Sequence, residues 1–106
     1  MKIMSLFKKK PKLKNPQLAA FINHRAIKYV TSRVENDVEY TLGKSGSISI
    51  HNGDLIIWCE GHEVFRTDVY EAEMGELLSR DGVRIKGKNQ KGELVSVVAH
   101  YTARRQ

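Results

Sequence analysis

The chain has 106 residues, of which 41% are hydrophobic and 28% charged, enough for one domain with one modest core. This composition excludes a disordered or collagen-like chain for the bulk of the sequence. The single Cys excludes a disulfide scaffold and a Cys-rich zinc site. No apolar run approaches the roughly 18–20 residues that span a bilayer.

The basic residues are concentrated toward the ends of the chain, although the formal net charge is +6 overall. Residues 1–33 contain nine Lys or Arg and no acid, whereas residues 34–103 contain seven basic and twelve acidic residues. A nucleic-acid-binding domain is expected to carry its Lys and Arg on the folded face. The high isoelectric point therefore gives only weak support for a nucleic-acid partner.

We expect residues 1–14 to form a flexible basic arm. The arm lacks the long apolar stretch and the cleavage site of a signal peptide, which together with the single Cys predicts a cytoplasmic protein. Two interpretations stay open: a solvated arm without a partner, or an arm that binds a polyanion, either nucleic acid or an anionic membrane surface. The candidate polyanion contacts in the arm are Lys8, Lys9, Lys10, Lys12 and Lys14.

A single domain is expected over residues 15–106, and it begins with a helix. Asn15 can cap the first turn, and Pro16 is tolerated at the first helical position because it needs no hydrogen-bond acceptor there. The apolar residues that follow recur every three or four positions: Leu18, Phe21, Ile22, Ala26, Tyr29 and Val30. This spacing predicts a helix over residues 16–32.

A β-rich body is expected over residues 37–102, because the apolar period changes to two after Arg33. Turn signals at residues 43–46, Asn52-Gly53, Gly61-His62 and Asp81-Gly82 divide the body into short strands. The predicted fold is mainly β with an N-terminal helix, an antiparallel meander of six or seven strands that forms a roll or small barrel. Residues 73–79 are read as a strand, and the alternative is an α+β fold with a second helix at 69–79.

The hairpin turns predict which side chains share a face. A two-residue Asn52-Gly53 turn pairs Ile48 with Ile57. A turn at Gly61-His62 then sets Trp58 opposite Phe65, on the side of the strand away from Ile57. The outward patch of Ile56, Trp58 and Phe65 is either covered by the N-terminal helix or used for protein contact. If the helix covers it, Trp58→Ala should severely destabilise the protein.

No catalytic constellation is present in the sequence. Phosphate-loop, dinucleotide-binding, serine-hydrolase and zinc-protease motifs are missing. The four His residues are widely separated and are predicted to lie in turns or on the surface, so we predict no metal ligand and no cofactor. Cys59 falls on an apolar face, where a thiol behaves as a small hydrophobe with a raised pKa. The protein is therefore not expected to be an enzyme.

The body has one basic cluster, formed by Arg84, Lys86, Lys88 and the nearby Lys91. Arg84 and Lys86 alternate with apolar residues and are expected to point outward from a strand. We predict a small non-enzymatic binding or adaptor domain that acts through a protein partner or as a homo-oligomer. The alternative is polyanion binding through the Lys-rich arm, with this cluster as the first candidate on the body.

Several short motifs carry a resemblance. They are Leu42-Gly43-Lys44-Ser45-Gly46, Asn52-Gly53-Asp54, the run from Cys59 to Arg66, Gly75-Glu76-Leu77-Leu78-Ser79, Asp81-Gly82-Val83 and Val98-Ala99-His100-Tyr101. Over most of residues 17–101 the chain resembles small uncharacterised proteins of clostridial bacteria. The resemblance implies a stand-alone bacterial domain, and it implies no catalytic residue because that group carries no established function.

Overall fold

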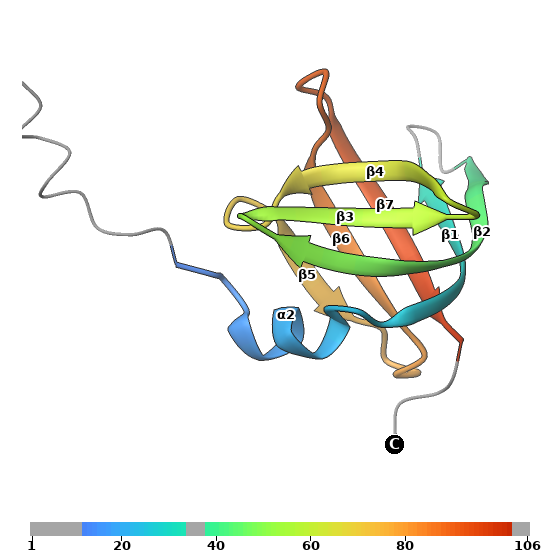
Figure 1. Ribbon diagram of the computed structural model, residues 1–106, viewed down its shortest axis with the longest axis horizontal. Helices are drawn as coiled ribbons and strands as arrows, with labels where there is room; N and C mark the ends of the chain where they lie inside the picture. Colours follow the sequence, from blue (N-terminus) through green and yellow to red (C-terminus); the bar gives the residue numbers. More distant parts are fainter. Residues whose placement is uncertain (1–11, 34–37, 103–106) are drawn as a thin grey trace, which may run out of the picture.

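The computed structural model describes residues 12–33 and 38–102, which form one short helix and seven strands (Figure 1). In chain order these are α2 (Pro16–Ile22), β1 (Ala26–Arg33), β2 (Glu39–His51), β3 (Asp54–Cys59), β4 (His62–Asp68), β5 (Glu73–Glu76), β6 (Gly82–Lys88) and β7 (Leu94–Tyr101). The prediction of a mainly β fold with an N-terminal helix is confirmed.

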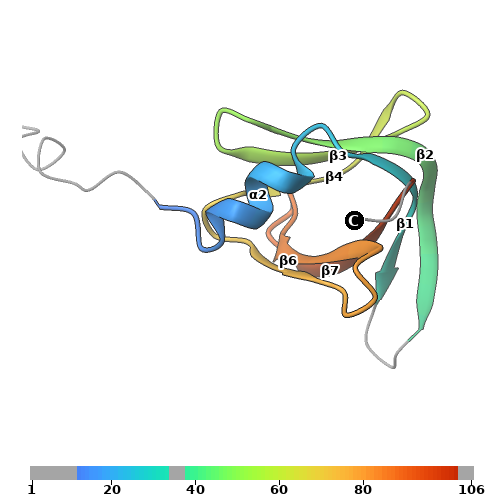
Figure 2. The same ribbon diagram turned by 90° about the horizontal axis from the view of Figure 1, so that it is seen from below.

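The seven strands form one antiparallel sheet in the order β4-β3-β2-β1-β7-β6-β5. Every pair of consecutive strands is hydrogen-bonded except β4 and β5, and β1 pairs with β7 instead. The predicted meander is thus confirmed, but the sheet has two free edges and does not close into a barrel. Figure 2 shows it as a roll with α2 inside its open side.

Strand β2 carries the chain around a corner of this roll (Figure 2). Its first half pairs with β1 and its second half with β3. Gly46 is a position of close approach between β2 and β3, since a Cβ placed there would be 1.6 Å from the carbonyl oxygen of Trp58. We predicted a turn at residues 43–46 that would separate two strands. Instead one strand continues and bends, with Ser45 at a φ of 52°.

The predicted helix over residues 16–32 is wrong beyond Ile22. Its start is as expected, because the Asn15 side chain accepts a hydrogen bond from the backbone N–H of Leu18. The helix ends where His24 adopts a φ of 68° and the Asn23 side-chain oxygen accepts a hydrogen bond from the N–H of Ile50. Residues 26–33 then form β1 in the middle of the sheet.

A β-bulge explains why the sequence of β1 has the apolar spacing of an amphipathic helix. The register between β1 and β7 shifts between Ile27 and Tyr29, which leaves Lys28 as the extra residue. Ile27 and Val30 are both buried in the core although they are three positions apart. The bulge therefore produces a helix-like apolar spacing in a strand, and pairing on both sides stabilises the strand.

The core fills the inside of the roll. Leu18 and Ile22 of α2 join the cluster that contains Ile57 of β3, so the helix packs on the inner side of the sheet. Leu13 also packs against this cluster, and the Lys14 ammonium donates a hydrogen bond to the carbonyl of Glu71. The last residues of the predicted arm are therefore attached to the body.

The register of β3 is confirmed on one side and wrong on the other. Ile48 pairs with Ile57 as predicted. The next turn is formed by Glu60 and Gly61, both at positive φ, and a bulge follows in β4, where Val64 is the extra residue. Phe65 consequently pairs with Ile57, and its side chain is buried in the core.

The outward patch expected from Ile56, Trp58 and Phe65 does not form. Phe65 points into the core, Ile56 is buried, and Trp58 is 36% exposed. Because α2 packs on the opposite side of β3, it does not cover the indole. The expected severe destabilisation by Trp58→Ala loses its physical basis.

Residues 73–79, which we predicted to form a strand, contain β5, and the alternative second helix at 69–79 does not form. The predicted register of this hairpin is wrong, because Met74 rather than Leu78 pairs with Ile85. The connection is longer than a two-residue turn: the N–H of Leu77 donates to the carbonyl of Gly82, and Leu78 is fully exposed. The predicted strand beginning at residue 83 and that over 94–101 are confirmed.

Candidate functional site

The outer surface of β6 carries three of the predicted anion contacts. Val83, Ile85 and Gly87 are buried and alternate with exposed residues. The exposed residues are Arg84, Lys86 and Lys88, which the structure thus brings together on one side of the sheet. Their spacing along the strand is about 7 Å, because successive residues on one face are two positions apart.

Cross-strand pairing adds residues from four more strands. Arg84 pairs with Val98, Val98 with Thr31, and Lys86 with Ser96, which in turn pairs with Arg33. Directly opposite residues of a sheet point to the same face. The outward cations are therefore Arg33, Lys44, Arg84, Lys86 and Lys88, and the outward carboxylates are Glu39 and Glu73. We call this surface, on β1, β5, β6, β7 and the first half of β2, the basic face.

An aromatic pair lies on the same surface. Tyr29 of β1 is opposite His100 of β7, and their rings stack with centroids 4.3 Å apart and an interplanar angle of 21°. The bulge at Lys28 is what turns Tyr29 outward, since strict alternation from the buried Ile27 would point it into the core. Lys44 pairs with Tyr29 on the other side and completes the row.

The cations of the basic face have few partners. Among the described residues, the ion pairs present involve Arg66 and none of the five cations named above. The carboxylate of Glu39 accepts a hydrogen bond from the Thr31 hydroxyl at 2.8 Å. Since α2 packs on the inner side of the roll, it leaves this face open (Figure 2).

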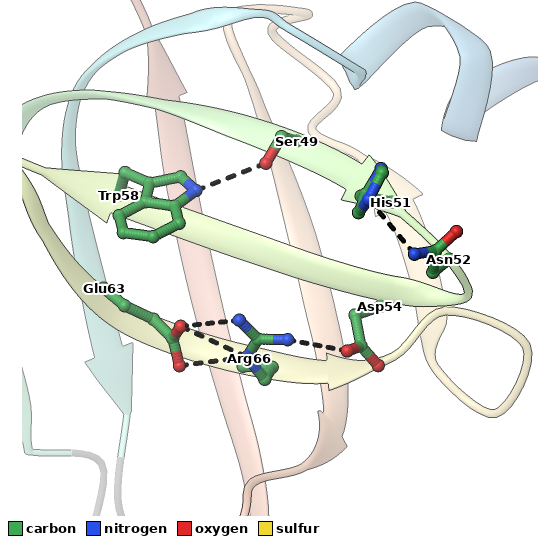
Figure 3. Close-up of polar contacts among 7 residues, drawn as sticks. All are labelled: Ser49, His51, Asn52, Asp54, Trp58, Glu63 and Arg66. Carbon is green, nitrogen blue, oxygen red and sulfur yellow. Dashed lines mark hydrogen bonds and ion pairs between the residues drawn. The ribbon is translucent and has the colours of Figure 1, made fainter.

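The outer surface of β3, β4 and the second half of β2 is different (Figure 3). We call it the Trp58 face. The indole N–H of Trp58 donates to the Ser49 hydroxyl at 3.3 Å. The Arg66 guanidinium donates to Asp54 at 2.6 Å and forms three hydrogen bonds to Glu63. Hydrogen bonds to Glu63, and then to Asp54, raise the pKa of Arg66. Its charge is neutralised within the face.

Strand β4 crosses β6 (Figure 1), and residues of both strands line two grooves. Gly87 permits this crossing, because a Cβ there would be 2.3 Å from the Thr67 hydroxyl. One groove, of about 780 Å³, carries both carboxylates and Lys side chains. The other, of about 700 Å³, opens beside Tyr40 and Leu94, which are 48% and 63% exposed. Its wall is partly apolar, so it can hold an apolar side chain.

The remaining candidates for chemistry are dispersed. His24, His51 and His62 are exposed at turns or strand ends, as predicted, whereas His100 stacks in the sheet. Within the described residues, no three His, Cys, Asp or Glu side chains come together as a metal site requires. Burial, and then the charge of Glu60, raises the pKa of the Cys59 thiol, which disfavours the nucleophilic thiolate.

The structure brings together some of the predicted contacts and not others. Lys8, Lys9 and Lys10 lie outside the described residues. Lys12 is exposed and precedes α2 in the chain. Sequence analysis identified the β6 cluster from its alternation. It missed Lys44 and the ring pair of Tyr29 and His100, since only the cross-strand register and the bulge place them beside that cluster.

No protein-family model, curated protein or solved structure matches this chain. Within residues 12–33 and 38–102, no helix reaches the length and apolarity needed to cross a membrane. The arrangement of the basic face is therefore the observation on which a functional argument can rest.

Proposed function

We propose that this protein is a non-enzymatic binding domain whose basic face binds a polyanion. The observation that carries the proposal is the gathering of five cations with two carboxylates on one open face. This happens although residues 34–103 contain more acids than bases. Lys and Arg on such a surface bind phosphate or sulfate groups, and binding releases counterions.

The dimensions of the face suit an extended polyanion. From Lys44 on β2 to Arg84 on β6 it spans three strand spacings, or about 14 Å. From Arg84 to Lys88 it extends about 13 Å along β6. The predicted Lys-rich arm is a second candidate for the same ligand, and the cytoplasmic location expected from the sequence would agree with a nucleic-acid partner.

Salt elution from immobilised heparin tests the proposal with the full-length chain. The face variant replaces Lys44, Arg84, Lys86 and Lys88 with Gln. The matched control makes the same change in charge within the arm, at Lys8, Lys9, Lys10 and Lys12. Thermal unfolding shows that both variants fold. We expect the face variant to elute at much lower salt and the arm variant to elute close to the unchanged protein.

Two results would contradict the proposal. If the arm variant loses retention and the face variant keeps it, the arm is the binding segment. If both lose retention equally, net charge alone governs binding. In either case the basic face is not a specific surface.

A protein partner or a second copy of the chain is the second candidate. It is supported by the exposed Tyr40 and Leu94 beside the groove of about 700 Å³. Sedimentation velocity tests association between copies. A dimer that Tyr40→Ser dissociates would support this candidate, and a monomer at all concentrations would oppose self-association through the groove.

A further inference from the structure

The stacked pair of Tyr29 and His100 adds a feature that phosphate binding alone does not need. The two rings lie 4.3 Å apart on the neighbouring strands β1 and β7 of the basic face and are half-buried there. One side of each ring is against the other. The remaining ring surface is bordered on one side by Lys44 of β2. Along the strands it is bordered by the next outward cross-strand pair, Val98 and Arg84.

Rings of this kind, set among cations on an open sheet, match the chemistry of unpaired nucleobases. Bases stack on aromatic side chains irrespective of sequence, while Lys and Arg contact the phosphates on either side. A sulfated polysaccharide has no base that could stack on these rings. A face of this kind would therefore distinguish polyanions by whether they carry accessible bases.

Other polyanions fit the face less well. In a duplex the bases are stacked on one another, and their edges are reached by a helix or a β-ribbon that enters a groove. A membrane surface favours protruding apolar side chains among the cations. On the basic face the central apolar residue, Val98, is half-buried, and the exposed Leu94 lies only at the rim, opposite Lys88.

We infer that the polyanion is single-stranded nucleic acid, with a base stacked against the Tyr29–His100 pair and the adjacent phosphates on Lys44 and Arg84. This inference rests on the proposed function of the basic face. The face is wide enough for two or three nucleotides, the number that comparable sheet platforms stack.

Fluorescence anisotropy of a labelled 12-nucleotide oligothymidylate, with the full-length chain, tests the inference. Tyr29→Leu removes the ring and keeps apolar bulk, and Tyr29→Phe keeps the ring. Trp58→Ala is the matched control, because it removes an exposed aromatic residue from the Trp58 face. Heparin, a duplex of the same length and vesicles rich in phosphatidylserine are the competing probes.

We expect Tyr29→Leu to weaken oligonucleotide binding roughly 5- to 150-fold, while Tyr29→Phe and Trp58→Ala bind like the unchanged protein. Heparin retention should not change in any of them. Because His100→Gln removes the other ring, it should also weaken oligonucleotide binding. This variant replaces Tyr29→Leu as the test if Tyr29→Leu does not fold.

The failure of the inference and the failure of the proposed function give different results. Unchanged oligonucleotide binding in Tyr29→Leu and His100→Gln, or tighter binding to the duplex or the vesicles, overturns the inference alone. In that case the face variant still loses heparin retention. If the face variant keeps heparin retention, the proposed function fails first and the inference falls with it.

Discussion

The basic face and the Trp58 face are two outer surfaces of one sheet, joined by β2, yet their charges are arranged in opposite ways. On the Trp58 face, Arg66 is held by Glu63 and Asp54, and the indole of Trp58 donates to Ser49. On the basic face, the rings of Tyr29 and His100 stack on each other. Within the described residues, none of the five cations of this face forms an ion pair. The first surface pairs its arginine with its own carboxylates, and the second leaves its cations available to a ligand.

This comparison shows what the net charge of a segment conceals. Averaged along the chain, the body is mildly acidic. In three dimensions the sheet places cations from β1, β2 and β6 on one face, while Asp54 and Glu63 lie on the other surface. Because a polyanion responds to local charge, the distribution of charged residues between the two faces matters more than the net charge of the segment.

The largest expected effect concerns the corner of β2 that joins the two faces. Gly46→Ala would place a Cβ 1.6 Å from the backbone oxygen of Trp58, and backbone cannot move aside as a flexible side chain can. We expect a loss of more than about 5 kcal/mol in the free energy of unfolding. Thermal and urea unfolding measure it. Gly75→Ala is the control, because no atom lies within 4 Å of the added Cβ.

The next prediction compares residues on the two sides of the β3–β4 hairpin. Phe65 is buried in the core, so Phe65→Ala should cost roughly 3–5 kcal/mol of unfolding free energy. Trp58 is 36% exposed, so Trp58→Ala should cost only about 1–2 kcal/mol. Urea unfolding followed by circular dichroism checks both values. A larger cost at Trp58 than at Phe65 would contradict the observed register.

A smaller effect compares one arginine from each face. Arg84→Gln should weaken oligonucleotide binding several-fold at low salt and reduce the slope of log affinity against log salt by about 0.7. Arg66→Gln should leave the affinity and the slope unchanged, because Glu63 and Asp54 already neutralise that guanidinium. Anisotropy titrations at several salt concentrations measure both. Equal effects of the two variants would show that the faces do not differ as binding surfaces.

The smallest expected effect concerns Cys59, which points inward beside the outward Trp58. Burial raises the pKa of its thiol, so the neutral thiol is favoured in the folded state. The associated stabilisation is complete below the pKa of the unfolded chain and is lost as the pH rises through the higher folded pKa. We expect slow reaction with Ellman's reagent at pH 8 and rapid reaction in urea. Rapid reaction of the folded protein would contradict this burial.

Much of the fold could be predicted from local patterns. Alternation in β6 and β7 and the Asn52-Gly53 turn predicted inward residues and one register correctly, because these signals depend on neighbours in the sequence. The helix boundary could not be predicted. Ile27 and Val30 have helical spacing only because Lys28 is a bulge residue, and a bulge is set by pairing with distant strands.

The candidate site shows the same limit. The β6 cations were identified because their alternation is local. Tyr29 was assigned to a helix, and His100 was read as a surface residue, since nothing near either of them in the sequence indicates that they stack. Strands β1 and β7 are separated by most of the chain, and only their pairing brings the rings together.

Mapping a bound oligonucleotide by NMR tests the central claim most directly. The full-length, ¹⁵N-labelled chain is titrated with the 12-nucleotide oligothymidylate, and amide shifts are compared between the two faces. We predict the largest changes at Tyr29, Lys44, Arg84 and His100, and none beyond background at Trp58 and its neighbours. Changes centred on the Trp58 face, or confined to the Lys-rich arm, would contradict the account.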